Sequence, residues 1–571
     1  MSALSPDTDQ VTLRHIGQGS LRGGISSNGA LVWRGIPYAA PPVGELRWRA
    51  PRPAPRFIGE LAALEHGGPC VQDIALAAPF VDTDGDGLVG SEDCLYLNVF
   101  APAGSSSTDR LPVMYFIHGG GNVGGHNAAV TYDGSELAQR HNVVVVTINY
   151  RLGLLGWFVH PAFQTAQTAD ASPDDRSGNW GTLDIIAGLE WVRANVAAFG
   201  GDASNVTIFG ESAGGVNVYS LLLSPRAKGL FQRAIVQSGG LLCDSLQSAT
   251  HYADDPEPGS ANSSRELVNR LLLKRGQAQD LAAAKALQNE LHPDAIAQLL
   301  RQTTPAELIA LANPERLRLY PAPRVLRDGW VLPQEPWLEA IAAGRFHKVP
   351  LITGTNRDER RLYQYLEPRW RKTMRETPGD YVLYAHYGSL AWKQLAVDDV
   401  ARAMLKAGHR EVYAYRFDWD EQGAVNGLDI SLAIGAGHAV ELPFVFGTSS
   451  SLTPGLDGVV EPSRHALSSS MMSYWAQHAY AGAPGRGREG SEVEWLAFND
   501  RAEEPCLLLL DTAADGGVRM CSERVDRSSL RAAVLEENGF VNKGLHAQLY
   551  RGLFQGSGFD EAEYQRLRAR V

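Results

Sequence analysis

The chain has 571 residues, of which 44% are hydrophobic and 20% are charged. This composition excludes a disordered chain, which needs few apolar residues and a high net charge. The 31 prolines exclude a long coiled coil, and the 59 glycines follow no collagen-like period. The net charge of −12 argues against nucleic acid as a partner, because an acidic surface repels phosphate backbones.

The apolar runs and the N-terminal segment bear on membrane insertion and targeting. The longest apolar runs, such as 143–146 and 507–510, are far shorter than the roughly 20 residues that a membrane-spanning helix needs. The segment Met1–Asp7 lacks the basic and apolar regions of a signal peptide, so we expect a cytoplasmic protein or a trimmed secreted one. The five cysteines are too few for a disulfide scaffold and match no zinc pattern.

The predicted strands fall into two kinds. Residues 11–40 alternate short apolar runs with Gly and Asn, which predicts a small antiparallel sheet at the N-terminus. Later runs are apolar on both faces, as is typical of a buried, mostly parallel sheet. They stand at 112–117, 143–148, 206–209, 234–236, 349–352 and 412–415.

Helical patterns separate the later strands. Apolar residues recur at steps of three and four over 184–199. Strands that alternate with helices predict an α/β fold with a large central sheet flanked by helices. Residues 250–345 are rich in helical patterns, and we expect them to form an excursion that covers the sheet edge. Because no linker is evident, we predict one domain over 1–571.

A candidate nucleophile follows the strand at 206–209. The segment Gly210–Gly214 places Ser212 between this strand and a predicted helix at 216–223. Small residues two positions on either side allow a sharp turn that holds a serine hydroxyl above the carboxyl end of a sheet. The alternative is a glycine turn with an incidental serine, and the strand and helix context favours the nucleophile.

A glycine-rich segment upstream, Phe116–Gly121, ends another predicted strand. Its glycines can bring main-chain N–H groups to a developing alkoxide, and the N–H of Ala213 would add a third donor. An ordinary glycine turn is the alternative, and the nearby serine turn favours an oxyanion hole. We expect His118 to brace this loop rather than to act as the base.

An activated serine needs a histidine base, which in turn needs a carboxylate. Asp358 and Glu359 follow a predicted sheet strand, and His438 lies in a glycine-rich loop after another. Periodicity alone does not choose among the downstream candidates. The other histidines considered, in helical or surface-like stretches, are His386, His409, His465, His478 and His546.

Two long segments, Glu92–Phe100 and Phe199–Gly214, carry recognisable signatures. On these, the chain resembles the type-B carboxylesterases, a cholinesterase-like family of α/β-hydrolases, from about residue 11 to about residue 500. The resemblance implies an α/β-hydrolase fold and a serine esterase that cleaves carboxylic esters through an acyl-enzyme, with no catalytic cofactor. A lipase acting on longer-chain glycerides is the alternative. Supporting matches are Arg34–Tyr38, Pro41–Gly44, Asn149–Gly153, Gln237–Gly240, Asp358–Glu359 and Gly437–Gly447.

The resemblance also selects catalytic residues. It implies a triad of Ser212, Glu359 and His438, and so prefers Glu359 to Asp358. It implies an oxyanion hole formed by Gly120, Gly121 and Ala213. The family also contains adhesion proteins that have lost triad residues, but all three are present here.

Supporting roles follow from the same resemblance. Glu211, beside the nucleophile, is expected to be a secondary electrostatic group, with a solvent-facing residue as the alternative. Asn122 replaces the aromatic residue that usually follows the oxyanion glycines, which alters the pocket wall. Leu241 and Phe444 are candidate pocket residues, although core packing is equally consistent with their type.

The cysteines and one expected ion pair can also be compared with those of the family. Cholinesterases carry a choline-binding tryptophan between the cysteines that match Cys70 and Cys94, and this chain has none there, so we do not expect choline esters. A Cys70–Cys94 disulfide would stabilise the fold by about 3 kcal/mol, and a reduced pair is the alternative. Cys243 stands alone near the family's second disulfide. Glu92 is expected to pair with Arg47.

The acidic segment 82–93 resembles a calcium-binding loop. Asp82, Asp84, Asp86 and Asp93 take liganding positions, with a glycine at the sixth position. An aspartate replaces glutamate at the twelfth position and no helix pair flanks the loop, so a solvated acidic turn is the alternative to a structural calcium.

The expected partner is a small-molecule ester, and we expect a monomer or small homo-oligomer.

Overall fold

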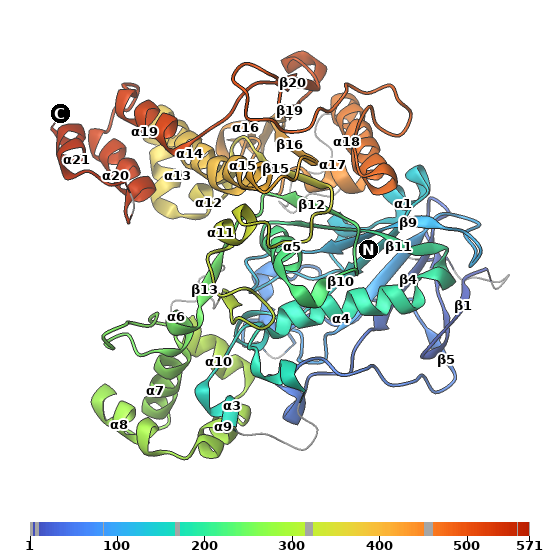
Figure 1. Ribbon diagram of the computed structural model, residues 1–571, viewed down its shortest axis with the longest axis vertical. Coiled ribbons are helices and arrows are strands. Elements are labelled where there is room, and N and C mark those ends of the chain that lie inside the picture. Colours follow the sequence, from blue (N-terminus) through green and yellow to red (C-terminus); the bar gives the residue numbers. More distant parts are fainter. Residues whose placement is uncertain are drawn as a thin grey trace. The chain divides into compact units, whose positions relative to one another are not determined.

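The computed structural model describes residues 4–5, 11–83, 85–165, 172–313, 324–449, 461–556 and 558–569 (Figure 1). The chain divides into two compact units. The first comprises Met1–Gln232, Leu242–Ala340 and Arg345–His347, and the second comprises Arg233–Leu241, Ile341–Gly344 and Lys348–Val571.

The sheet strands of the first unit run in the order β11, β9, β10, β8, β4, β3. The three strands β11, β9 and β10 are parallel, and their carboxyl ends align, because Gly210 and Ile148 both pair with Ile117. This alignment brings the segments that follow the three strands to one edge of the sheet. The bounds are β11 (Gly201–Glu211), β9 (Leu111–Ile117), β10 (Val144–Ile148), β8 (Tyr96–Ala101), β4 (Leu31–Pro37) and β3 (Gly24–Ile25).

Helices pack against the strands of this sheet and bury them. Every residue of β10 is buried, and so is every residue of β9 after its first. Helix α4 (Trp180–Asn195) approaches the sheet closely at Gly188, where an added Cβ would lie 2.1 Å from the hydroxyl of Tyr115. That hydroxyl donates a hydrogen bond to the carbonyl of Ile185 at 3.0 Å. Helix α5 (Ala213–Leu223) also packs on β11.

The small N-terminal sheet is present. Strands β1 (Leu13–Ile16) and β2 (Gly19–Arg22) pair antiparallel, and β5 (Glu60–Ala62) joins β2 in parallel. The other strands expected within residues 11–40 are β3 and β4, which join the large sheet instead.

Residues 250–345 contain a run of helices, drawn in green in Figure 1. Within the first unit, α7 packs against α8, α10 contacts α2 (Gly153–Gly156) and α9 contacts α3 (Pro161–Thr165). The helices are α7 (Ser264–Lys274), α8 (Leu281–Glu290), α9 (Pro293–Arg301) and α10 (Pro305–Ala312).

The sheet strands of the second unit run in the order β12, β15, β16, β19, β20. The first four are parallel, and β20 is antiparallel to β19. Together with the first unit, these buried parallel strands and their flanking helices confirm the predicted α/β class. The bounds are β12 (Arg233–Gln237), β15 (Leu351–Asn356), β16 (Val412–Phe417), β19 (Leu507–Leu510) and β20 (Arg519–Cys521).

Within the second unit, helices α19 and α20 at the end of the chain pack against α14 (Pro378–Lys393), and α21 packs against α20 (Figure 1). Their apolar side chains form one cluster around Val534, Tyr550 and Tyr387. Within the described residues, no helix has both the length and the apolarity that crossing a membrane requires. The remaining bounds are α12 (Glu359–Leu366), α13 (Pro368–Glu376), α15 (Asp399–Lys406), α16 (Ile430–Ala433), α17 (Leu442–Phe446), α18 (Glu461–Ala481), α19 (Arg527–Glu536), α20 (Lys543–Phe554) and α21 (Glu561–Arg568).

Candidate active site

Ser212 occupies a sharp turn between strand β11 and helix α5. Its φ of 58° and ψ of −121° are sterically unfavourable for a residue with a side chain. A Cβ added to Gly214 would lie 1.9 Å from the carbonyl oxygen of Ile117, and one added to Gly210 would lie 2.6 Å from the carbonyl carbon of Gly214. The tight packing therefore requires glycine at both positions, and it forces the serine into its strained conformation.

The main-chain N–H groups around this turn are available as donors. No side chain caps the N-terminus of α5, and Gly120 and Gly121 have φ values of 105° and 65° that favour glycine. The carbonyl of Gly120 accepts from the N–H of Val123 at 3.1 Å, which closes a tight turn. In the part of the chain that the structure describes, no hydrogen bond is donated by the N–H of Gly120, Gly121 or Ala213.

His118 braces the glycine loop, as expected from the sequence. Its Nδ1 atom lies 2.8 Å from the carbonyl oxygen of Gly119, and its ring stacks on Tyr150 with centroids 4.4 Å apart. The Tyr150 hydroxyl donates to the main-chain carbonyl of His118 at 2.6 Å. Burial lowers the pKa of His118 to about 3. The ring is therefore neutral at pH 7, and we assign the Nδ1 proton to the Gly119 hydrogen bond.

The residues on either side of this loop and the serine are buried. Asn122 is 6% exposed, and its Oδ1 atom accepts from Nδ2 of Asn217 on α5 at 2.9 Å. This contact ties the glycine loop to the helix that begins after Ser212. Glu211 is 2% exposed, and its Oε2 atom lies 2.9 Å from where a Cβ on Gly119 would stand. Gly119 thus leaves room for the Glu211 carboxylate.

The second unit holds a buried carboxylate–imidazole pair. Glu359 is the first residue of α12, three positions after the end of β15, and it is fully buried. Its Oε2 atom lies 2.5 Å from Nδ1 of His438, which lies in the loop between α16 and α17 and is 6% exposed. A proton on Nδ1 is then held by the carboxylate, which leaves Nε2 as the atom that can exchange a proton.

Two further donors satisfy the other oxygen of Glu359. The hydroxyl of Ser238 donates to Oε1 at 2.5 Å, and the main-chain N–H of Asn356 donates to it at 2.8 Å. Ser238 follows strand β12 with a φ of 50°. The segment 237–240 matches the family in sequence, but that match assigns no role to this serine. Its signal was the motif itself, but its partner lies 121 residues away.

Asp358, the competing acid in the sequence, has structural partners instead. It forms ion pairs with Arg357 at 2.9 Å and Arg361 at 3.2 Å. Its Oδ2 atom also accepts from the N–H of Ala436 at 3.1 Å, two residues before His438. Asp358 therefore holds the His438 loop, while Glu359 contacts the imidazole.

The two hydrophobic residues assigned to a pocket lie in the second unit. Phe444 is in α17, is 1% exposed, and packs edge-to-face on Phe417 and Trp419 with centroids 5.0 Å apart in each case. It contributes to the core there. Leu241 follows β12 in a loop and is half-buried.

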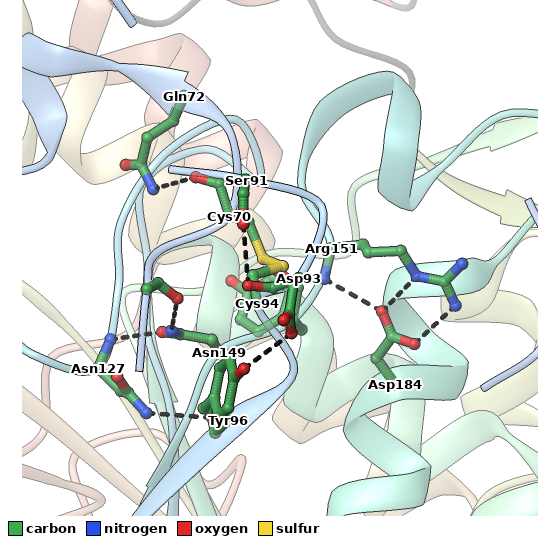
Figure 2. The surroundings of a disulfide bond; sticks show 12 residues. Cys70, Gln72, Ser91, Asp93, Cys94, Tyr96, Asn127, Asn149, Arg151 and Asp184 are labelled. Carbon is green, nitrogen blue, oxygen red and sulfur yellow. Dashed lines mark hydrogen bonds and ion pairs between the residues drawn. A yellow bond between two sulfur atoms is a disulfide. The ribbon is translucent and has the colours of Figure 1, made fainter. Parts of the chain in front are cut away.

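Cys70 and Cys94 form a disulfide, shown in Figure 2. Beside it, the Tyr96 hydroxyl donates to Oδ1 of Asp93 at 2.8 Å. The same view shows the buried ion pair of Arg151 and Asp184, with its Nη2 to Oδ1 distance of 2.7 Å. The structure thus has the oxidised form of the two alternatives.

Two other expectations about supporting residues agree with the structure. Nε of Arg47 donates to Oε1 of Glu92 at 2.6 Å, and its Nη1 donates to the carbonyl of Thr303 at the same distance. This confirms the predicted Arg47–Glu92 pair. Cys243 is a free thiol.

The acidic loop is closed by the two-stranded sheet of β6 (Gln72–Asp73) and β7 (Leu88–Val89). Asp82 accepts from the N–H groups of Gly85 and Gly87 at 2.7 and 2.8 Å. Asp84 lies outside the described residues. Among those described, no three His, Cys, Asp or Glu side chains are grouped to hold a metal ion. The calcium site stays a prediction.

A serine on a strained strand-to-helix turn and a buried Glu–His pair, both on α/β sheets, are typical of the α/β-hydrolases. The chain matches the carboxylesterase family model over residues 8–383 and 383–519, and it belongs to that family. The protein is accordingly a carboxylic ester hydrolase.

Named relatives agree with this assignment. The chain is 34% identical over 507 residues to the para-nitrobenzyl esterase of Bacillus subtilis, covering 85% of this chain and 92% of the relative. It is 34% identical over 518 residues to human cocaine esterase, covering 83% and 84%. A carboxylesterase structure from Geobacillus stearothermophilus matches with a TM-score of 0.67 and 29% identity, covering 91% and 99%. These relatives are esterases, which favours an esterase over the lipase alternative.

Proposed function

We propose that Ser212, Glu359 and His438 form the catalytic triad of this esterase. The observation that carries the proposal is the 2.5 Å contact between Glu359 and His438, since a buried carboxylate on Nδ1 prepares Nε2 to act as a base. The strained turn at Ser212 supports its role as the nucleophile. Gly120, Gly121 and Ala213 would supply the oxyanion hole.

In the first half of the reaction, Nε2 of His438 takes the hydroxyl proton as Oγ of Ser212 attacks the ester carbonyl carbon. The C=O electron pair moves onto the carbonyl oxygen, whose negative charge is stabilised by the main-chain N–H donors. When the C–O bond to the alcohol breaks, the imidazolium returns its proton to the leaving oxygen. The product is the alcohol and an ester on Ser212.

Water completes the cycle by the same route. His438 removes a proton from the water as it attacks the acyl carbon, and it then protonates Oγ of Ser212 as the acid is released. Glu359 stabilises the imidazolium in both halves without itself taking a proton. This sequence needs no cofactor.

The substrate class that we propose is a small-molecule ester. The name para-nitrobenzyl esterase describes such a substrate for the Bacillus subtilis relative. A series of p-nitrophenyl esters from acetyl to palmitoyl tests this proposal. We expect the highest kcat/KM with short acyl chains in solution, and activation on emulsified long-chain glycerides would favour a lipase instead.

The triad is tested by Ser212→Ala. We expect the variant to keep its circular dichroism spectrum and to lose at least about 10³-fold of kcat on p-nitrophenyl acetate. An organophosphate should add one phosphoryl group, located on Ser212 by mass spectrometry of peptides. Labelling of a different serine, or most activity remaining in the variant, would remove Ser212 from the role.

We also propose a structural calcium in the acidic loop, a monomer or small homo-oligomer, and a cytoplasmic location. Calorimetric titration of metal-stripped protein with calcium tests the acidic loop, and no heat would dispose of a structural calcium there. Sedimentation velocity tests a monomer or small homo-oligomer. Fractionation of the source cells tests a cytoplasmic location, since recovery outside the cytoplasm would contradict it.

A further inference from the structure

Two aromatic rings pack against the imidazole of His438. The ring centroid of Trp392 lies 5.0 Å from that of His438, and the centroid of Tyr363 lies 5.2 Å from it. Both rings are inclined to the imidazole by 42°. They also stack on each other, with centroids 5.8 Å apart and an interplanar angle of 28°. All three residues belong to the second unit.

Trp392 also contacts the segment that supports the acid. Its indole Nε1 donates to the main-chain carbonyl of Gly239 at 3.1 Å. Gly239 follows Ser238, whose hydroxyl donates to Oε1 of Glu359. Trp392 therefore packs on the imidazole with its ring and holds the loop of a Glu359 donor with its N–H group.

The chain after Trp392 is firmly anchored. Lys393 forms an ion pair with Asp398 at 2.7 Å, and both side chains are at most 2% exposed. Separating the two charges would leave each of them buried with weaker partners, at a large cost in free energy. Between them the helix takes π-helical form over Gln394–Asp398, a departure often found near functional sites.

The end of the chain reinforces this anchor. Oδ2 of Asp398 accepts from the N–H of Val525 at 3.0 Å, and Arg402 donates to the carbonyl of the same residue at 3.0 Å. Val525 lies beyond residue 519, where the match to the family model ends. The chain that follows Trp392 is thus anchored in part by a segment outside the family match.

We propose that Trp392 is a positioning residue for His438. The hydrogen bond to Glu359 holds the imidazole at Nδ1, and the indole limits rotation of the ring about its broad χ2 torsion. The indole face also stabilises the positive charge that the ring acquires during proton transfer. The inference rests on the proposed role of His438 as the base.

Trp392 is a better test position than Tyr363. Tyr363 lies four residues after Glu359 on helix α12, so a change there would also disturb the acid. Trp392 is on a different helix, α14, and its substitution leaves the Glu359–His438 hydrogen bond chemically possible.

Two variants distinguish the effect of the aromatic face of Trp392 from the effect of its volume. Trp392→Leu keeps an apolar side chain and removes the π face, while Trp392→Phe keeps a ring and removes the N–H donor. With p-nitrophenyl acetate we expect Trp392→Leu to lower kcat by about 10-fold or more, with KM within about 3-fold. The acid limb of its kcat/KM profile should move to lower pH by about half a unit, because the imidazolium loses its aromatic neighbour. Trp392→Phe should stay within about 3-fold of the parent.

Trp370→Leu is the matched control. Trp370 is 2% exposed on α13, and its ring packs on Tyr384 of α14 with centroids 4.3 Å apart. The same substitution therefore removes a tryptophan that packs against α14, the helix that carries Trp392. We expect it to lower the melting temperature. Its kcat per folded molecule should stay within about 2-fold of the parent, and the acid limb of its pH profile within about 0.2 unit.

His438→Ala distinguishes a failure of the proposed base from a failure of the proposed positioning role of Trp392. If this variant retains activity, the proposed base is wrong and the inference falls with it. If it is inactive but Trp392→Leu has the parental kcat and pH profile, the base stands and the inference is overturned. Equal kinetic losses in Trp370→Leu and Trp392→Leu would also overturn it, because both would then report general destabilisation.

Discussion

Oε2 of Glu359 lies 2.5 Å from Nδ1 of His438, and the glutamate is completely buried. The other carboxylate oxygen is occupied by two donors, the hydroxyl of Ser238 and the N–H of Asn356. A carboxylate held by these donors has a fixed orientation, which suits it to orient an imidazole and to balance its positive charge.

Removing this charge should slow catalysis strongly. Glu359→Gln retains the shape of the side chain but cannot balance the imidazolium, and we expect kcat/KM for p-nitrophenyl acetate to fall by about 10³-fold. Asp358→Asn is the control, because an asparagine oxygen can still accept from the N–H of Ala436. Its activity per folded molecule should fall by less than about 5-fold. The reverse ranking would make Asp358 the acid.

The hydroxyl of Ser238 should have a smaller effect. Ser238→Ala removes one of the two donors to Oε1 of Glu359 while the N–H of Asn356 remains. Hydrogen bonds to charged groups typically contribute 1.5–3 kcal/mol, so we expect kcat to fall by about 10-fold. Ser238→Cys keeps a weak donor on an unbranched side chain, as the φ of 50° requires, and should recover part of the loss. Parental kcat in the alanine variant would contradict the support role.

The Cys70–Cys94 disulfide should stabilise the fold without taking part in catalysis. The two cysteines are separated by 24 residues, a loop for which chain entropy predicts about 3 kcal/mol. The double variant Cys70→Ala, Cys94→Ala should therefore lose about this much free energy of unfolding in urea titrations. Cys243→Ser, which removes a free thiol, should change it by less than about 1 kcal/mol. Equal stability of the double variant and the parent would contradict the entropic contribution.

Buried neutral histidines should make the fold sensitive to acid. Burial lowers the pKa of His478 to about 3, whereas the unfolded chain binds a proton near pH 6.5. Its contribution to stability is complete above pH 6.5 and declines as the pH falls from there toward 3, because only the unfolded state takes up the proton.

His478→Phe removes this dependence and keeps a ring. Between pH 7 and 5 the parent should lose about 2 kcal/mol more of its free energy of unfolding than the variant loses. Urea titrations at both pH values measure the difference. Comparing the two losses cancels the other buried histidines, such as His118 and His126, which both proteins retain. Identical losses would show that His478 is protonated in the folded state.

The local elements of this fold were readable from sequence because each depends on nearby residues. Apolar runs gave the strands β9, β10, β15 and β16 within a few residues of their bounds. The serine turn was readable because glycines at 210 and 214 are required by a backbone contact that any such turn makes. The N-terminal strands were predicted to form one small sheet, whereas β4 pairs with β8, and β3 with β4, in the large sheet.

The sequence by itself determined the α/β class, the serine turn, the glycine loop and the carboxylesterase family, because these rest on short periodicities and contiguous motifs. The family resemblance already preferred Glu359 to Asp358, and the tertiary structure shows the contact of Glu359 with His438. Only the tertiary structure decided that Ser238 and Trp392 contact this pair and that Asp398 anchors the chain after Trp392. Those contacts join residues that are tens to more than a hundred positions apart. The amino-acid type at one position does not determine which distant atoms come within hydrogen-bonding distance when the chain folds.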